Sequence, residues 1–145
     1  MVTFAQTSDM KKLLSIGYSG WGFNLSMLCI RLVAGLFMLL AHGLDKLQKF
    51  NTLDSSFYNF MHLGHRTSLV LAIFAELFCS LFVILGLFTR FSVIPLIITM
   101  AVAVFGANAG QPLLEAETGL LYLTCYVVLL FCGPGKVSID GMMGK

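Results

Sequence analysis

The sequence predicts an all-α fold, a four-helix transmembrane bundle with a short interfacial helix in its first loop. Apolar residues make up 58% of the 145 positions and charged residues only 11%. That balance leaves too little polar surface to cover a soluble domain of this size. Four long apolar stretches also follow one another, separated by short polar or glycine-containing segments. A stretch of about 20 apolar residues matches a hydrocarbon layer roughly 30 Å thick.

The first span is expected over residues 22–44, behind an N-terminal tail and interfacial anchor formed by residues 1–21. Tyr18 and Trp21 stand just before the span, and their amphipathic rings favour the headgroup layer. Because Arg31 interrupts the apolar run and no small-x-small site follows it, we interpret this stretch as a retained span rather than a signal peptide.

The first loop, residues 45–66, is polar but carries apolar residues at helical spacing. These are Leu53, Phe57, Phe60 and Met61. The spacing predicts a short helix that lies on the membrane surface.

The second and third spans are expected over residues 67–88 and 91–108. Their connection, Thr89-Arg90, is so short that the two helices must be antiparallel neighbours. Pro95 falls near the start of the third span, where a proline is least disruptive.

The fourth span is expected over residues 118–132, ended by Gly133-Pro134-Gly135. It is short for a full crossing, so it tilts little, begins inside the layer with Glu117 buried, or gains length from Leu113-Leu114. Residues 22–135 then form one bundle domain, followed by a C-terminal tail of residues 136–145.

Two ionisable residues are predicted near the middle of the membrane. Arg31 and Glu76 fall inside the first and second spans, where an unpaired charge costs at least about 2.5 kcal/mol. Counted along the helices, their depths differ by only about 5 Å. We therefore predict an ion pair between Arg31 and Glu76.

The first span also predicts a polar track above this pair. His42 follows Arg31 by eleven residues, which returns it to nearly the same helical face, and Lys46 stays close to that face. Two interpretations remain open. Arg31 and Glu76 either orient the bundle as a buried pair, or they line a pocket whose mouth carries His42 and Lys46.

Several chemistries are not supported by the residues. The net charge of +2 is too small to suggest a nucleic-acid partner. No phosphate-binding glycine loop or nucleophile–base arrangement is recognisable. His42 with Glu76 is too sparse a set for a metal unless the loop residues His62 and His65 contribute. The four cysteines lack C-x-x-C spacing and lie in apolar runs, which favours packing roles.

The chain resembles the DoxX family of small four-span membrane proteins. The matching segments, in chain order, are Arg31-Leu32, Gly35, Phe37, His42-Gly43, Lys46-Leu47, Ala75-Glu76-Leu77, Leu85-Gly86-Leu87-Phe88-Thr89-Arg90, Glu117, Leu120-Leu121-Tyr122-Leu123 and Gly133-Pro134-Gly135-Lys136-Val137-Ser138-Ile139-Asp140. By position, the resemblance carries over Arg31, His42, Lys46, Glu76 and Glu117 as pocket or ligand-binding residues. Members often have a histidine late in the third span, where this chain has Phe105-Gly106-Ala107-Asn108.

The resemblance implies a bacterial cytoplasmic membrane location and a link to quinone or thiol redox chemistry. No covalently bound cofactor is expected, and quinone is the cofactor class that the family implies. The first hypothesis is a redox-linked subunit in which a quinone ring meets His42 or Lys46 and a partner protein supplies electrons. The second is a non-enzymatic membrane factor that binds a partner membrane protein or a lipid. Assembly with further copies of the chain is left open.

Orientation follows from the basic residues outside the spans. Lys11, Lys12, Arg90, Lys136 and Lys145 fall on one side, against Lys46, Lys49 and Arg66 on the other. The excess predicts that both termini lie in the cytoplasm.

Overall fold

A computed structural model describes residues 17, 19–110 and 112–144 of the chain. Within these residues all regular structure is helical and no strand is present. Four helical stretches are long and apolar enough to cross a membrane. Their bounds are Gly20–Gln48, His65–Leu85, Thr89–Ala107 and Leu114–Cys132. The predicted all-α transmembrane bundle is therefore confirmed.

The first span is built from three consecutive helical pieces. They are α2 (Gly20–Phe37), the π-helical turn η1 (Met38–Gly43) and α3 (Leu44–Gln48). The Ser19 hydroxyl caps α2 by accepting a 3.0 Å hydrogen bond from the Gly22 amide, which satisfies one of the free N–H groups at the helix start. Trp21, predicted as an interfacial anchor, is 75% exposed beside this cap. Tyr18 and residues 1–16 lie outside the described residues.

The helical segment expected in the first loop is present as two short pieces. They are α4 (Phe50–Leu53) and the 3₁₀ turn η2 (Phe60–His62). Met61 and His62 both have positive φ angles, 48° and 62°, which α-helical geometry does not allow. The loop therefore bends back toward the bundle after α4.

The second span also contains a π-helical turn. It comprises α5 (His65–Phe74), η3 (Ala75–Cys79) and α6 (Ser80–Leu85). Gly86 ends it in the left-handed region at φ 69°, a conformation that glycine adopts without strain.

The third and fourth spans are joined by a turn near Gly110. The third comprises α7 (Thr89–Val102) and the π-helical η4 (Ala103–Ala107), and the fourth comprises the 3₁₀ turn η5 (Leu113–Ala116) and α8 (Glu117–Cys132). The fourth span thus gains length from the residues before Glu117, one of the alternatives that the sequence offered. A short helix, α9 (Ile139–Met142), follows in the C-terminal segment.

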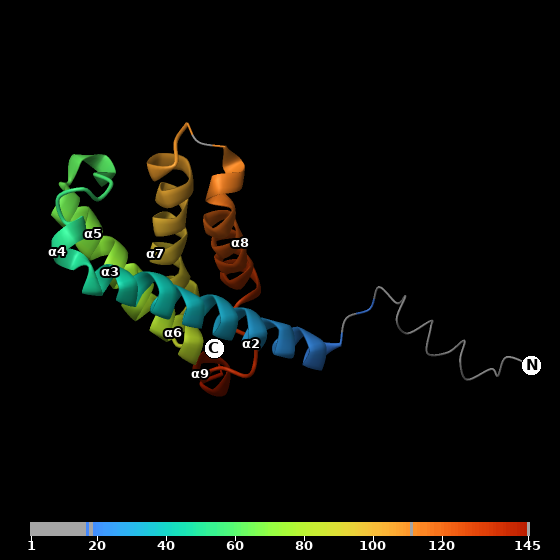
Figure 1. Cartoon of the computed structure of the whole chain (residues 1–145). Helices are drawn as coiled ribbons and strands as arrows, with labels where there is room; N and C mark the ends of the chain where they lie inside the picture. Colours follow the sequence, from blue (N-terminus) through green and yellow to red (C-terminus); the bar gives the residue numbers. More distant parts are fainter. Residues whose placement is uncertain (1–16, 18, 111, 145) are drawn as a thin grey trace, which may run out of the picture.

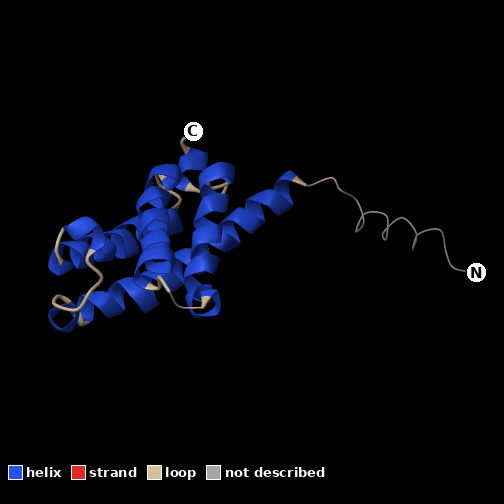
Figure 2. Ribbon diagram, turned by 90° about the horizontal axis from the view of Figure 1, so that it is seen from above, coloured by secondary structure: helices blue, strands red, loops and turns tan. Residues whose placement is uncertain are grey.

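The four spans do not lie parallel to one another. In Figure 1, α7 and α8 run side by side, whereas α2 crosses in front of them at a steep angle; Figure 2 shows the same crossing from above. Glycines allow close contact where the first span meets the second. A methyl group at Gly43 would lie 2.9 Å from the Glu76 backbone, and one at Gly35 would lie 2.5 Å from Ile84. Small residues permit such contacts between membrane helices.

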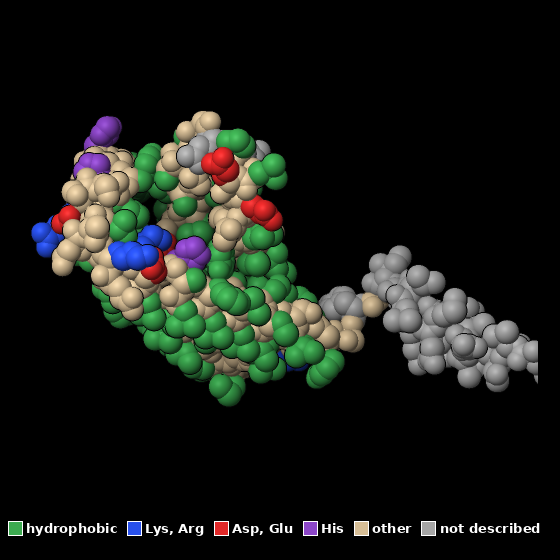
Figure 3. Space-filling model, in the orientation of Figure 1, with side chains coloured by type: hydrophobic (Ala, Val, Ile, Leu, Met, Phe, Trp, Pro, Cys, Tyr) green, Lys and Arg blue, Asp and Glu red, His purple; other side chains and the backbone are tan. Residues whose placement is uncertain are grey.

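A cluster of buried side chains from all four spans forms the core. It includes Met27, Met38, Val83, Val93, Leu96, Tyr126 and Leu129. Large apolar side chains remain exposed along the spans, such as Phe37, Phe78 and Leu121. In Figure 3 the lower body of the molecule is mainly hydrophobic, while most of the charged side chains in view gather toward the upper end. This distribution fits a protein surrounded by lipid.

Candidate binding cavity

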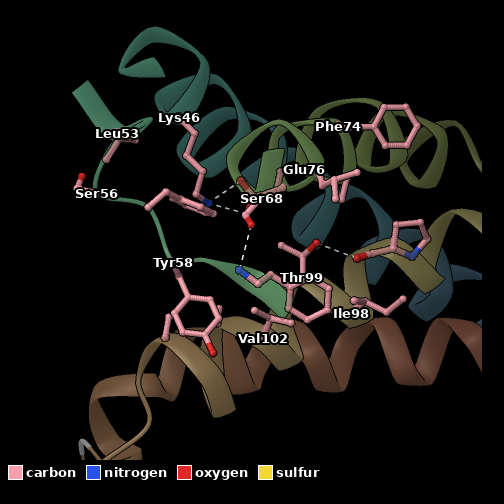
Figure 4. Close-up of a pocket in the computed structure, with 18 residues that line it drawn as sticks. Lys46, Leu53, Ser56, Tyr58, Ser68, Phe74, Glu76, Ile98, Thr99 and Val102 are labelled. Carbon is pink, nitrogen blue, oxygen red and sulfur yellow. Dashed lines mark hydrogen bonds and ion pairs between the residues drawn. The ribbon is translucent and has the colours of Figure 1, made fainter. Parts of the chain in front are cut away.

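A cavity of about 560 Å³ lies between the second and third spans, beneath the first loop. Its walls come from α5, η3, α7 and η4, and its roof comes from the loop after α4. Figure 4 shows the lining side chains. They include Lys46, Leu53, Phe57, Tyr58, Phe60, Ser68, Leu71, Phe74, Glu76, Ile98, Thr99 and Val102.

Small side chains create this hollow. Ala72 and Ala75 line it from the second span, and Ala103 and Ala107 line it from the third. Ala75 belongs to η3, and Ala103 and Ala107 belong to η4. The π-helical turns of both spans therefore lie at the cavity, and such turns occur frequently at functional sites.

A buried ion pair lies on one wall of the cavity. Lys46 Nζ lies 2.6 and 2.7 Å from the two carboxylate oxygens of Glu76 (Figure 4). The Glu76 side chain is 1% exposed and that of Lys46 is 22% exposed. An ammonium group has three donors, and this one reaches the carboxylate from the end of the first span, with η1 packed against η3.

Hydrogen bonds fix the loop that roofs the cavity. The Ser68 hydroxyl accepts a 3.0 Å bond from the Phe60 amide, and the Asn59 side chain accepts a 2.8 Å bond from the Gly64 amide. His65 Nδ1 bonds to the carbonyl of Phe57. The roof is thereby tied to the first turn of α5.

The cavity has a lipid-facing side. Leu71 and Phe74 on α5 and Ile98 on α7 line the cavity, yet these side chains are 49%, 52% and 49% exposed. All three belong to apolar membrane-spanning stretches. The side of the cavity at these two helices is therefore apolar and exposed.

Arg31 does not pair with Glu76, so that prediction is wrong. Arg31 is 2% exposed, and its guanidinium donates to four backbone carbonyls. The acceptors are Val83 at 3.0 Å, Ile84 at 3.0 Å, Pro134 at 2.8 Å and Val137 at 2.8 Å.

The wrong pairing has a geometric cause. Counting residues gives depth only when helices run parallel, and α2 crosses the bundle steeply (Figure 1). Contacts at Gly35 with Ile84, and at Gly43 with Glu76, show the actual register. In this register Arg31 reaches the last turn of α6 and donates to the carbonyls of Val83 and Ile84, near the helix end where carbonyls need partners from outside the helix.

Asp140 is a buried charged residue that the sequence reasoning did not select. Its carboxylate accepts hydrogen bonds from the amides of Phe88 and Thr89, each at 2.9 Å, and from the Thr89 hydroxyl at 3.1 Å. It also interacts electrostatically with Arg31. In the sequence Asp140 stands out only as part of the family resemblance, because it follows the fourth span by eight residues and its burial depends on the return of the C-terminal segment to the bundle.

The other predicted site residues have different surroundings. His42 packs edge-on against Tyr122, with ring centroids 5.5 Å apart, and the residues that line the cavity do not include it. Tyr122 stacks on Tyr126, which is fully buried and interacts electrostatically with Glu76. Glu117 is exposed at the start of α8. Of the five predicted residues, Lys46 and Glu76 are thus the two that meet at the cavity.

No group of three or more His, Cys, Asp or Glu side chains that could hold a metal occurs among the described residues. Cys29, Cys79, Cys125 and Cys132 are free thiols.

Comparisons with known proteins agree with this architecture. The model of the DoxX family matches residues 26–109. An uncharacterized membrane protein of Mycobacterium tuberculosis, Rv3486, is 31% identical over 137 residues, which cover 83% of this chain and 82% of that protein. No solved structure matches the chain.

Proposed function

We propose that this chain, which belongs to the DoxX family of multi-pass membrane proteins, binds a quinone in the cavity between its second and third spans. In this proposal it serves as a redox-linked membrane subunit. The observation that carries the proposal is the Lys46–Glu76 pair on the wall of a mostly apolar cavity.

The cavity has the properties of a site for a small amphiphilic ring. Ligand pockets are commonly about 300–1,000 Å³ in volume, mostly apolar, with a few placed polar groups. This one measures about 560 Å³. Its exposed apolar side, at Leu71, Phe74 and Ile98, suits a ligand that arrives from the bilayer.

Lys46 is the residue proposed to contact the ligand. Its ammonium group has three N–H donors. Its side chain is 22% exposed, so Glu76 does not cover it completely. A ring carbonyl that accepts from Lys46 would be oriented by it, while Glu76 holds the ammonium in place. A bound quinone would supply two-electron, two-proton chemistry, and the electrons would come from a partner protein.

The proposed location is the bacterial cytoplasmic membrane, with both termini in the cytoplasm. An even number of crossings puts the start of α2 and the end of α8 on the same side. The charge argument for the orientation also uses Lys11, Lys12 and Lys145, which lie outside the described residues. Reporter fusions at the two termini test the orientation.

Thermal unfolding with and without a short-tailed ubiquinone analogue tests the proposed function. A ligand that binds only the folded state raises the unfolding temperature. We expect a rise for the unchanged protein, and little or none for Glu76→Gln, in which the anchor of Lys46 is weakened. Ala103→Leu should also abolish the rise because it fills the cavity without touching the pair, whereas Ala109→Leu, outside the cavity, should preserve it.

A different outcome would favour the second hypothesis, a membrane factor that binds a partner protein or a lipid. An unfolding temperature that does not respond to saturating quinone, but rises when a co-purifying membrane protein is added, would exclude the quinone site. If the cavity binds a lipid instead, a phospholipid should raise the unfolding temperature of the unchanged protein, and Ala103→Leu should remove that rise.

A further inference from the structure

A second cavity, of about 1260 Å³, lies at the opposite end of the bundle from the first loop. It is lined where α2 begins, where α7 begins and where α8 ends. Figure 1 shows α9 at this end, below α2 and α6. Its lining includes Trp21, Asn24, Arg90, Phe91, Lys136 and Asp140.

Two positively charged residues line this cavity, and both belong to segments with fixed positions. The Arg90 guanidinium donates to the carbonyl of Phe131 at 3.3 Å and lies over Gly133, where an added methyl group would be 3.6 Å from Nη2. The Lys136 amide donates to the Asn24 side chain at 2.7 Å. The Arg90 guanidinium at the start of α7 is thus held at the end of α8, and the start of α2 fixes the backbone that carries Lys136.

The acidic residue in the cavity does not cancel these charges. The carboxylate of Asp140 is engaged by two backbone amides and the Thr89 hydroxyl, and it is also attracted to Arg31. It is 8% exposed, whereas Arg90 and Lys136 are exposed. The accessible charge of the described lining is therefore positive.

Aromatic rings line the same cavity as the two cations. Trp21 and Phe91 are each 75% exposed and Phe88 is 48% exposed, and all three line the cavity. A tryptophan at the end of a membrane span favours the depth of the lipid headgroups. Basic pockets between spans on the cytoplasmic side, where the proposed orientation puts this end of the bundle, bind acidic headgroups.

We infer that this cavity binds one anionic phospholipid, with its phosphate at Arg90 and Lys136 and its acyl chains beside Phe91. The charge is complementary to a phosphodiester, and the aromatic rim distinguishes an amphiphile from a soluble anion. This site is separate from the quinone cavity, so either one stands without the other.

The test uses the full chain in nanodiscs of phosphatidylcholine, with or without about one-fifth phosphatidylglycerol. Phosphatidylglycerol should raise the unfolding temperature by about 3 °C or more. The double variant Arg90→Gln/Lys136→Gln should lose most of this rise, and native mass spectrometry should show one fewer retained phosphatidylglycerol. The conservative pair Arg90→Lys/Lys136→Arg should retain both effects.

A charge-matched control separates a specific site from general attraction to an acidic bilayer. Lys49→Gln/Arg66→Gln also removes two positive charges, but near the first loop, and should keep the full rise. Equal losses in the two double variants would overturn the inference. So would an equal rise with soluble glycerol phosphate added to phosphatidylcholine nanodiscs, because the site would then take a free phosphate rather than a lipid.

Discussion

At the scale of single residues, the buried charges of this protein are stabilised in two different ways. Glu76 is paired with a side chain of opposite charge, Lys46. Arg31 instead donates to four backbone carbonyls, two of them in the last turn of α6. Both solutions avoid an unpaired charge in a lipid environment, which costs at least about 2.5 kcal/mol.

Replacing Arg31 should therefore damage the fold more than replacing an exposed cation. Arg31→Met would leave carbonyls of α6 and of the C-terminal segment without their donor, and we expect a loss of about 3 kcal/mol or more in unfolding free energy. Lys49→Met is the matched control, because Lys49 makes an exposed pair with Asp45 and such pairs contribute about 0.5 kcal/mol. Unfolding in detergent measures both, and equal losses would show that the carbonyl contacts of Arg31 are unimportant.

At the scale of the helices, π-helical turns interrupt three of the four spans. They are η1, η3 and η4. A π-helical turn holds one residue more than an α-helical turn, so it changes which side chains face the next helix. Here η1 packs on η3 beside the Lys46–Glu76 pair, and Ala103 and Ala107 of η4 line the cavity.

The contact between η1 and η3 depends on Gly43. Gly43→Ala would put a methyl group 2.9 Å from the Glu76 backbone, so η1 and η3 must separate and the Lys46–Glu76 pair is strained. We expect about 1–3 kcal/mol of destabilisation and a weaker response to the quinone analogue. Gly20→Ala is the control, since nothing lies within 4 Å of the added methyl group. If the two variants unfold at the same temperature, this close contact is not required.

At the scale of the whole molecule, the C-terminal segment joins parts of the bundle that are distant in the sequence. Pro134 and Val137 accept from Arg31 of α2, and Asp140 accepts from the amide of Phe88 and the first amide of α7. The segment thus connects the first span to the turn between the second and third spans. The cavity lies between the second and third spans, which that turn joins, and it is lined there by exposed apolar side chains of α5 and α7.

Truncation tests this connecting role. Removing residues 137–145 deletes both the Val137 carbonyl, which accepts from Arg31, and the Asp140 carboxylate. We therefore expect that the protein no longer folds into a monodisperse species in detergent. Removing only residues 143–145 spares both and should leave the elution profile and unfolding temperature nearly unchanged. Normal folding of the longer truncation would mean that the bundle does not need the segment.

The sequence by itself determined the membrane class and the four spans, with their ends placed to within about four residues, because span length and apolar content depend on local composition. It also placed Lys46 and Glu76 among the residues of interest. The tertiary structure alone decided which charges meet. Which charged side chains pair depends on the crossing of α2, on the π-helical turns and on the return of the C-terminal segment. None of these follows from counting residues along parallel helices. Thus Glu76 pairs with Lys46, and Arg31 binds the carbonyls at the C-terminal end of the second span.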